Sequence, residues 1–244
     1  MPDTTSKLPD LTDPRYLHEV GWFLLQQKHK DVYAGGGYEA YRPAHSEALK
    51  EEVLGLLEQS EEWLADKVIV SVGTGCACEL RAWPGSLKVE VDPLLYVYQQ
   101  LDMLLDDRDD APPTLRLAVG IEDLPLLDEF ADVVVCRNAI DHVEHPSKGL
   151  DEMWRVLKPE GHLFLSVDLG GEPTPDEPNP FAPGQVEEMI ADRFEIVGRS
   201  DDHRPHAGWR DSNSRFLLRR LGRKAPSLDK GAVIDAYERS LDGQ

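Results

Sequence analysis

The segment that most constrains the fold of this chain is an apolar run that ends at two glycines. It reads Val-Ile-Val-Ser-Val-Gly-Thr-Gly and spans residues 68–75. A run rich in β-branched residues predicts a buried strand, and glycine at its end permits a turn whose backbone N–H groups approach a ligand closely. A second strand, predicted over residues 88–91, ends at Asp92. Asp92 follows the first glycine, Gly73, by about nineteen residues. A carboxylate at this separation can accept hydrogen bonds from both hydroxyls of a ribose, so the two segments predict a nucleoside-binding half-site.

The glycine turn does not identify the nucleoside. Dinucleotide enzymes and enzymes that use S-adenosylmethionine (SAM) both combine such a turn with an acidic residue. The third glycine of a dinucleotide fingerprint would fall at position 78, where Cys78 stands. That glycine normally permits close packing of the helix on the strand, so its absence argues against a nicotinamide or flavin cofactor.

Four further signals follow in order over residues 121–167. An acidic turn ends in Leu-Pro, a strand begins Phe-Ala-Asp-Val-Val, a strand-end loop finishes at His142, and a helix closes with Arg-Val-Leu-Lys-Pro-Glu-Gly over residues 155–161. Together with the glycine turn, this order resembles the class I SAM-dependent methyltransferases of the methyltransferase-11 type, over about residues 66–167. Glu160 stands where the family has the first of two glycines. The resemblance implies SAM as the cofactor.

Apolar spacing predicts helices that alternate with strands. Strands are predicted at residues 68–72, 88–91, 114–119, 131–136, 161–167, 193–199 and 214–219. Helices are predicted from Arg15 to about Lys30, from Pro43 onward, over 93–105, before Lys158 and over 232–241, with a glycine-rich loop at 31–42. The alternation predicts an α/β fold with a doubly wound, mostly parallel, Rossmann-like sheet. The last two strands are joined by a short loop, so we expect the last of the seven strands to be antiparallel, as in the methyltransferase sheet.

Three segments are expected along the chain. Residues 1–64 form an N-terminal helical cap with the Tyr/Gly loop, residues 65–222 form the SAM-binding core, and residues 223–244 form a tail with a short helix. The length of 244 residues suits one principal α/β domain with additions, and we expect a monomer or homodimer.

Charge and cysteine usage exclude several classes of function. Lys and Arg number 26 against 46 Asp and Glu, a net charge of -20, which disfavours a nucleic-acid partner. The acidity is typical of solubility or adaptation to salt, and a preference for cationic substrates is the alternative. No apolar run reaches the length of a membrane span, and the polar N-terminus has no signal-peptide core. The odd number of cysteines (Cys76, Cys78 and Cys136) does not suit a disulfide framework, so we expect a cytoplasmic protein without a membrane partner.

The resemblance assigns a set of cofactor-binding residues at the carboxyl edge of the sheet, where open α/β sheets bind ligands. They are Ser71, Gly73, Thr74, Gly75, Asp92, Pro93, Ile121, Glu122 and Asn138. The two glycines present backbone to the methionine portion of SAM. Ser71 stands where the family usually has Asp or Glu, and its hydroxyl can still form a hydrogen bond. Asp92 is the ribose acceptor or, alternatively, a helix N-cap ahead of Pro93.

Adenine recognition departs from the family pattern. Gly120 stands where an Asp is common, so the Ile121 backbone N–H and either Glu122 or Asp123 are expected to supply this contact. Asn138 is expected to offer its carbonyl to the SAM ammonium group.

His142 is the candidate general base, because histidine titrates near neutral pH. Its alternative role is to cap the following turn. Asp141 is the second catalytic candidate, although neighbours in extended chain face opposite ways and a His–Asp pair is not expected. Methyl transfer is an in-line displacement, so holding acceptor and methyl group in line can supply most of the rate.

Irregular segments are the expected walls of the acceptor site. Aromatic residues Tyr33, Tyr38 and Tyr41 flank a Gly-Gly-Gly sequence and can close over the ligand or, alternatively, pack the N-terminal helices. The loop between the last two strands carries His203, His206 and Trp209. Its histidines suggest a metal site, but a polar loop has the same composition and no third ligand is fixed by spacing, so no metal is expected.

These patterns predict a SAM-dependent methyltransferase that acts on oxygen or nitrogen of a small-molecule acceptor. Three alternatives remain: a SAM-binding relative without turnover, a polyamine (aminopropyl) synthase that uses decarboxylated SAM, and an NAD(P)-dependent oxidoreductase.

Overall fold

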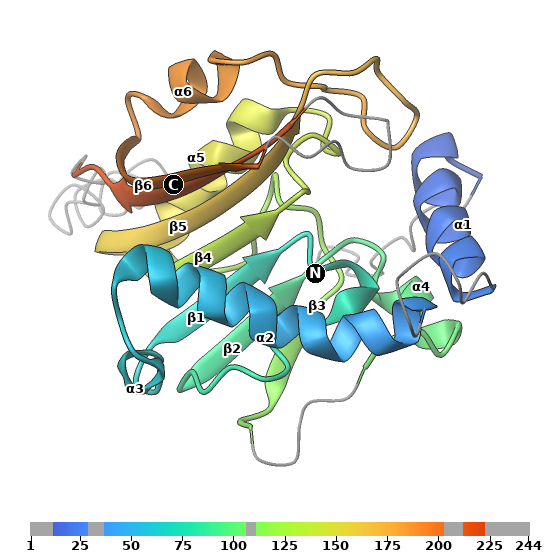
Figure 1. The fold of residues 1–244 in the computed structure, drawn as a ribbon, viewed down its shortest axis with the longest axis horizontal. Helices are drawn as coiled ribbons and strands as arrows, with labels where there is room; N and C mark the ends of the chain where they lie inside the picture. The colour runs from blue at the N-terminus through green and yellow to red at the C-terminus, as the bar shows by residue number, and fades with distance from the viewer. Residues whose placement is uncertain (1–11, 29–36, 106–110, 203–211, 223–244) are drawn as a thin grey trace, which may run out of the picture.

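The computed structural model describes residues 12–28, 37–105, 111–202 and 212–222, and these form one sheet with helices on both sides (Figure 1). The strands are β1 Val68–Val72, β2 Leu87–Val91, β3 Thr114–Leu117, β4 Ala131–Arg137, β5 Leu157–Leu169, β6 Phe194–Asp202 and β7 Ser212–Arg220. The helices are α1 Pro14–Lys28, α2 Gly37–Leu57, α3 Glu61–Leu64, α4 Leu95–Gln100, α5 Pro146–Val156 and α6 Gln185–Ile190, with a 3-10 turn η1 at Gly75–Ala77.

The seven strands of the described chain follow the order β3-β2-β1-β4-β5-β7-β6. β7 is antiparallel to β5 and β6, and the other neighbouring strands are parallel. This arrangement confirms the predicted doubly wound sheet with an antiparallel last strand. The strand order reverses between β1 and β4, and such a reversal opens a crevice beyond the carboxyl ends of the two strands.

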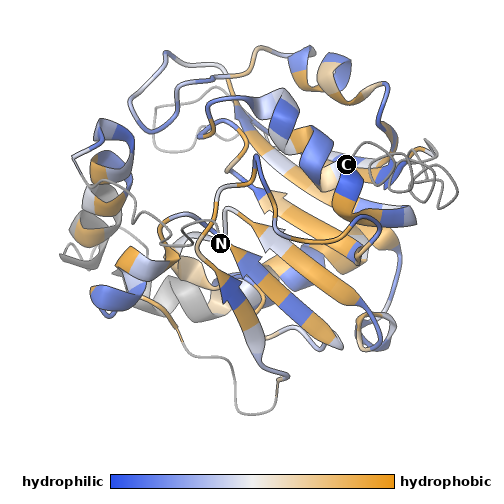
Figure 2. Cartoon of the chain, turned by 180° about the vertical axis from the view of Figure 1, so that it is seen from behind, coloured by the Kyte–Doolittle hydropathy of each residue, from blue (hydrophilic) through white to orange (hydrophobic). Residues whose placement is uncertain are grey.

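Each central strand is apolar on both sides because helices cover both faces of the sheet. On one face, Ile69 of β1 and Val133 of β4 pack against Leu49 and Val53 of α2. On the other face, alternate residues of the same strands pack against α5 and α6. Figure 2 shows the resulting apolar centre of the sheet, which matches the near-continuous hydrophobic runs typical of buried parallel strands.

The start of α2 differs from the prediction. Residues 37–42 were expected to belong to a loop, with Pro43 opening the helix, but α2 begins at Gly37 and continues through Pro43. Gly37 occupies the first helical position, and Pro43 stands in the second turn, where it has no N–H to donate to the preceding turn. Packing of the later turns of α2 against the sheet outweighs these local preferences.

The observed bounds of two other elements differ from the predicted ones. The helix expected over residues 93–105 is confined to Leu95–Gln100, and Asp102 beyond it adopts a left-handed backbone (φ 55°) that does not continue a helix. β5 begins at Leu157, which pairs with Ala131, before the closing motif turns at Glu160 (φ 62°). The helix predicted over residues 232–241 lies outside the described residues.

α1 stands beyond the carboxyl ends of the strands in both views (Figures 1 and 2). Its buried Val20 packs in a small cluster with Leu94, Val97 and Tyr98. No helix in the described part of the chain is both long and apolar enough to cross a membrane.

Candidate functional site

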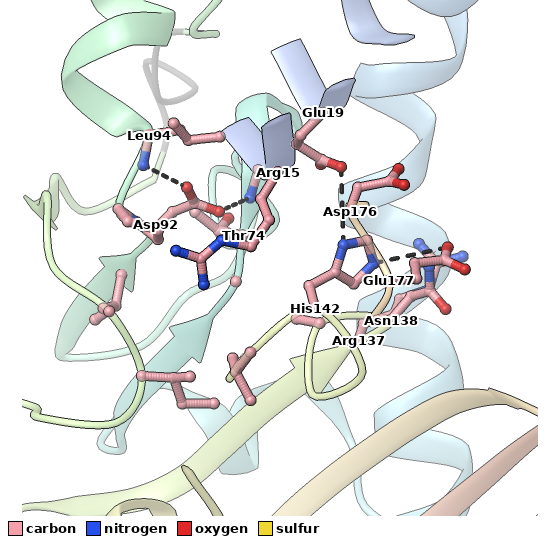
Figure 3. A pocket seen from close by; sticks show the side chains of 18 of the residues that line it. Arg15, Glu19, Thr74, Asp92, Leu94, Arg137, Asn138, His142, Asp176 and Glu177 are labelled. Atoms are coloured by element: carbon pink, nitrogen blue, oxygen red, sulfur yellow. Dashed lines mark hydrogen bonds and ion pairs between the residues drawn. The ribbon is translucent and has the colours of Figure 1, made fainter. Parts of the chain in front are cut away.

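A cavity of about 440 Å³ lies at the carboxyl edge of the sheet. It is lined by residues from the four predicted loops, namely the glycine turn, the Asp92 turn, the loop after β3 and the loop after β4. α1 and the segment after β5 also line it, through Arg15, Tyr16, His18, Glu19, Thr174, Asp176 and Glu177, and further lining residues come from α2, β5 and β7, namely His45, Ser166, Asp168, Asn213 and Arg215. Figure 3 shows Asp92 and His142 on neighbouring parts of this wall, with Glu19 of α1 beside them.

The glycine turn has a backbone that other residues rarely adopt. Gly73 has φ 69° and Gly75 has φ 57°, both in the left-handed region. A Cβ atom at position 73 would lie 2.2 Å from the Cβ of Ala139 in the loop after β4. The Gly73 N–H donates to the Val91 carbonyl at 2.8 Å, so the turn is fixed against β2 as well.

Asp92 has two structural partners. Its Oδ2 accepts a hydrogen bond from the Gly75 N–H at 2.9 Å, and its Oδ1 accepts one from the Leu94 N–H at 2.8 Å. The side chain is buried on the cavity wall, and this burial raises the pKa of Asp92 to about 6. Asp92 therefore fixes the glycine turn and the start of the next helical segment, while it also faces the cavity.

Ser71 does not line the cavity and instead holds a carboxylate that does. Its Oγ donates to Glu79 Oε2 at 2.6 Å. The other oxygen of Glu79 lies 3.5 Å from His45 Nε2, and the Glu79 N–H donates to Thr74 Oγ1 at 3.2 Å. Glu79 is buried and lines the cavity. Glu79 thus places a carboxyl group next to Ser71, at the cavity.

Sequence analysis missed Glu79. The available signal was an acidic residue directly after the small residues Gly-Cys-Ala-Cys that follow the glycine turn.

Carboxylates surround His142, which lines the cavity (Figure 3). Its Nδ1 lies 3.8 Å from Glu19 Oε2. Its Nε2 lies 3.9 Å from Asp141 Oδ1 and 3.8 Å from Glu177 Oε1. We call these four residues the His142 cluster.

The expectation that Asp141 and His142 face apart was wrong. The chain is turned rather than extended here, with Asn138 at φ 47° and the His142 N–H donating to the Ala139 carbonyl at 3.2 Å.

Glu19 is a second residue that sequence analysis missed. It comes from α1, and burial raises its pKa to about 7, against the lowering effect of nearby His142. Two other charged residues of α1 also reach the core: His18 Nδ1 lies 2.9 Å from Asp176 Oδ2, and Arg15 Nη1 lies 3.9 Å from Glu144 Oε2. No local pattern in the sequence indicates that this helix would lie over the strand ends.

Asn138 has a buried polar atom that suits a ligand. Its N–H donates to the Ser166 carbonyl at 2.8 Å, but its side-chain Oδ1 is buried with no hydrogen-bond partner in the described residues. Pro93, Ile121 and Glu122 also line the cavity. Glu122 Oε1 accepts from the His145 N–H at 2.7 Å, which anchors it to the loop after β4.

The predicted acceptor residues lie mostly beyond the described chain. Tyr33, His203, His206 and Trp209 fall outside the described residues. Tyr38 and Tyr41 lie in the first turns of α2, where only the backbone is described.

Comparison with known proteins gives a consistent result. A family model described as a methyltransferase domain matches residues 70–165. The fold is similar to a SAM-dependent methyltransferase of Methanosarcina mazei, with 15% identity, a TM-score of 0.53, and 65% of this chain and 94% of that chain covered.

It is also similar to the 1,6-didemethyltoxoflavin N1-methyltransferase of Burkholderia thailandensis, solved with 1,6-didemethyltoxoflavin and S-adenosylhomocysteine. The identity is 17%, the TM-score 0.52, and the shares covered are 84% and 88%. At these identities the likeness establishes the fold. No curated protein sequence matches the chain significantly.

Proposed function

Because residues 70–165 belong to a class I SAM-dependent methyltransferase domain, we propose that the chain methylates an oxygen or nitrogen atom of a small-molecule acceptor. Bound SAM supplies the electrophilic methyl group on its sulfonium sulfur. The observation that carries the proposal is one cavity in which the glycine turn, Asp92 and the His142 cluster meet. Its volume of about 440 Å³ lies within the range of roughly 300–1,000 Å³ that small-molecule pockets have.

The residues present fit the cofactor. Gly73, Thr74 and Gly75 line the cavity, and the close approach of Ala139 excludes a side chain at position 73. We assign Glu79, held by Ser71, and the unpaired Asn138 Oδ1 to the SAM ammonium group. A buried carbonyl oxygen without a partner normally finds a donor, and an ammonium group is one.

We assign Asp92, next to Pro93, to the ribose hydroxyls. Each Asp92 oxygen accepts one backbone N–H and retains capacity for a further donor. Ile121 and Glu122 line the cavity beyond it and are assigned to adenine.

We propose that His142 is the general base that takes up the proton lost by the acceptor. Asp141 is buried behind the ring, and Glu177 lies on the same side. α1 contributes Arg15, Tyr16, His18 and Glu19 to the lining of the cavity. Tyr33, Tyr38, Tyr41, His203, His206 and Trp209 remain proposed contacts of the acceptor.

Calorimetry with a nucleoside panel tests the proposal. The purified chain is expected to bind SAM and S-adenosylhomocysteine, but neither NAD nor NADP. Binding of a dinucleotide without binding of SAM would overturn the assignment. A preference for decarboxylated SAM would indicate aminopropyl transfer, and SAM binding without a product from phenols, sugars or amines would favour a binding-only relative.

A further inference from the structure

Three side chains of the His142 cluster have the spacing of metal ligands. Asp141 and His142 come from the loop after β4, and Glu177 comes from the segment after β5. Each offers one ligand atom, and these atoms lie within 4.8 Å of one another. The contacts of 3.8 and 3.9 Å at His142 Nε2 are too long for hydrogen bonds. Bonds of about 2.0–2.5 Å to a shared ion place two donor atoms about 3–4 Å apart, which fits these spacings.

An independent observation is the lack of a hydrogen-bond partner at His142 Nε2 in the described part of the chain. This nitrogen is buried and has no hydrogen-bond partner among the described residues. Leaving a buried polar atom unsatisfied is unfavourable. It faces carboxylate oxygens, which only accept hydrogen bonds when ionised. The lone pair of an imidazole nitrogen and the oxygens of two carboxylates are all electron-pair donors, so a cation is a ligand that all three groups can bind at once.

The ligands are held in place by bonds between the two loops. The Asn179 N–H donates to the Asp141 carbonyl at 3.2 Å, and Asn179 Nδ2 donates to the Val143 carbonyl at 2.6 Å. Within the second loop, the Glu177 N–H donates to Thr174 Oγ1 at 3.1 Å, and the Thr174 N–H donates to the Glu177 carbonyl at 3.1 Å. Glu177 therefore lies next to His142 in a turn that is fixed by hydrogen bonds.

The second nitrogen of the ring also has the environment of a metal ligand. Histidine ligands are usually oriented by a carboxylate or carbonyl at the nitrogen that does not bind the metal. Glu19 Oε2 lies 3.8 Å from His142 Nδ1, opposite the two other carboxylates. This distance is too long for a hydrogen bond, so Glu19 of α1 is a neighbouring carboxylate at this nitrogen and not a bonded partner of the ring.

We propose that Asp141, His142 and Glu177 bind a divalent cation on the wall of the cavity. One nitrogen and two carboxylate oxygens form a hard donor set that suits Mn²⁺ or Mg²⁺, with Zn²⁺ as a competitor. His142 and Glu177 both line the cavity, so further positions on the ion face the acceptor.

The role of the cation rests on the proposed function. A hard cation prefers oxygen, so it would narrow the acceptor to a molecule that presents a hydroxyl or carboxylate oxygen. With the cation bound, His142 Nε2 would give its lone pair to the ion and would no longer take up the acceptor's proton. The ion would instead lower the pKa of an acceptor hydroxyl, which would lose its proton to water before the oxygen is methylated.

Manganese titration of the full chain tests the site. The protein is first treated with a chelator and desalted, and the electron paramagnetic resonance of free Mn²⁺ is followed as the ion is added. We expect a single Mn²⁺ per chain, with spin-echo modulation from one nitrogen ligand. Glu177→Gln and His142→Ala should each weaken binding by about tenfold or more. Glu144→Gln is the matched control, because Glu144 is in the same loop as His142 but outside the cluster, and it should retain the wild-type affinity.

Two results would overturn the inference. One is a wild-type protein that binds none of Mn²⁺, Mg²⁺, Zn²⁺ and Ca²⁺, and the other is unchanged Mn²⁺ affinity in both folded cluster variants. The nitrogen modulation is measured on the wild-type protein, so its absence counts against the site even if a variant fails to fold. SAM calorimetry on the same samples separates the proposals: SAM binding without a cation site removes only this inference, and a cation site without SAM binding removes only the proposed function.

Discussion

Asp92→Ala is expected to weaken SAM binding by about 10- to 150-fold. The Asp92 carboxylate is buried on the cavity wall, and each oxygen already accepts one backbone N–H, from Gly75 or from Leu94. A hydrogen bond to a charged group contributes about 1.5–3 kcal/mol, which corresponds to this range of affinity. If both ribose hydroxyls donate to Asp92, the loss lies at the upper end, because paired contacts are not additive.

The pH dependence follows from the pKa of Asp92. Burial raises this pKa to about 6, above the value of about 3.9 in an unfolded chain. Below about pH 6 the free protein binds a proton at Asp92, and SAM affinity should then fall by about tenfold per pH unit. Between about pH 4 and 6 the native state binds this proton more tightly than the unfolded chain, so Asp92 lowers the free energy of unfolding as pH rises. The Asp92→Ala protein should show neither this loss of SAM affinity nor this change in the free energy of unfolding.

Calorimetry of SAM and S-adenosylhomocysteine across this pH range measures the effect, with circular dichroism to confirm folding. The substitution also leaves the Gly75 and Leu94 N–H groups without an acceptor, which can loosen the glycine turn. A 2′-deoxyribose analogue of S-adenosylhomocysteine separates the two causes. If Asp92 binds the 2′-hydroxyl, the analogue loses less affinity on substitution than the parent ligand does. Equal SAM affinity in a folded Asp92→Ala protein would show that Asp92 serves only the backbone.

Three further substitutions are informative. Glu79→Gln should weaken SAM binding by about 1–3 kcal/mol in calorimetry, because it removes the buried charge held by Ser71; unchanged affinity would remove Glu79 from the cofactor site. His142→Ala should slow methyl transfer by about 10² to 10⁴ while SAM affinity stays nearly intact, and wild-type turnover at saturating acceptor would contradict its role. Gly73→Ala should lower the free energy of unfolding by about 2–5 kcal/mol, from overpacking and left-handed strain. Ala139→Gly in the same chain should restore the packing part, and equal melting temperatures of wild type and Gly73→Ala would refute the clash.

The sheet was predictable because the sequence of each central strand has a recognisable apolar pattern. β1 and β2 begin and end within a residue of the predicted bounds. β1 is apolar except at Ser71, and β2 has apolar residues at alternate positions and ends directly before Asp92. Helix boundaries were less predictable where packing overrides local preference. α2 extends through Pro43 to Gly37, and α4 stops before Asp102, although the apolar spacing continues to Leu104.

The parts of the candidate site that depend on sheet topology were predictable from the sequence. The side chains that reach the site from distant segments of the chain were not. The carboxyl ends of β1, β2, β3 and β4 had to meet at one edge, so Asp92 and His142 were placed on one cavity in advance. Glu19, Glu79 and Glu177 were missed, because they reach the site from α1, from an irregular turn and from a loop whose paths the sequence does not fix.

The missed residues change how the acidity of the chain is understood. A net charge of -20 was read as a property of the surface, yet part of it converges on the cavity. Burial disfavours the charged form of a carboxylate and raises the pKa of Asp92 to about 6, with a smaller contribution from neighbouring Glu79. A ligand that brings positive charge, as the sulfonium and ammonium groups of SAM do, favours the ionised form. By linkage, SAM binding near pH 6 should then release a proton, which calorimetry detects as a dependence of the binding enthalpy on the ionisation enthalpy of the buffer. Enthalpies that agree among buffers at this pH would show that Asp92 titrates elsewhere, and that the cavity is not tuned for a cationic ligand through this residue.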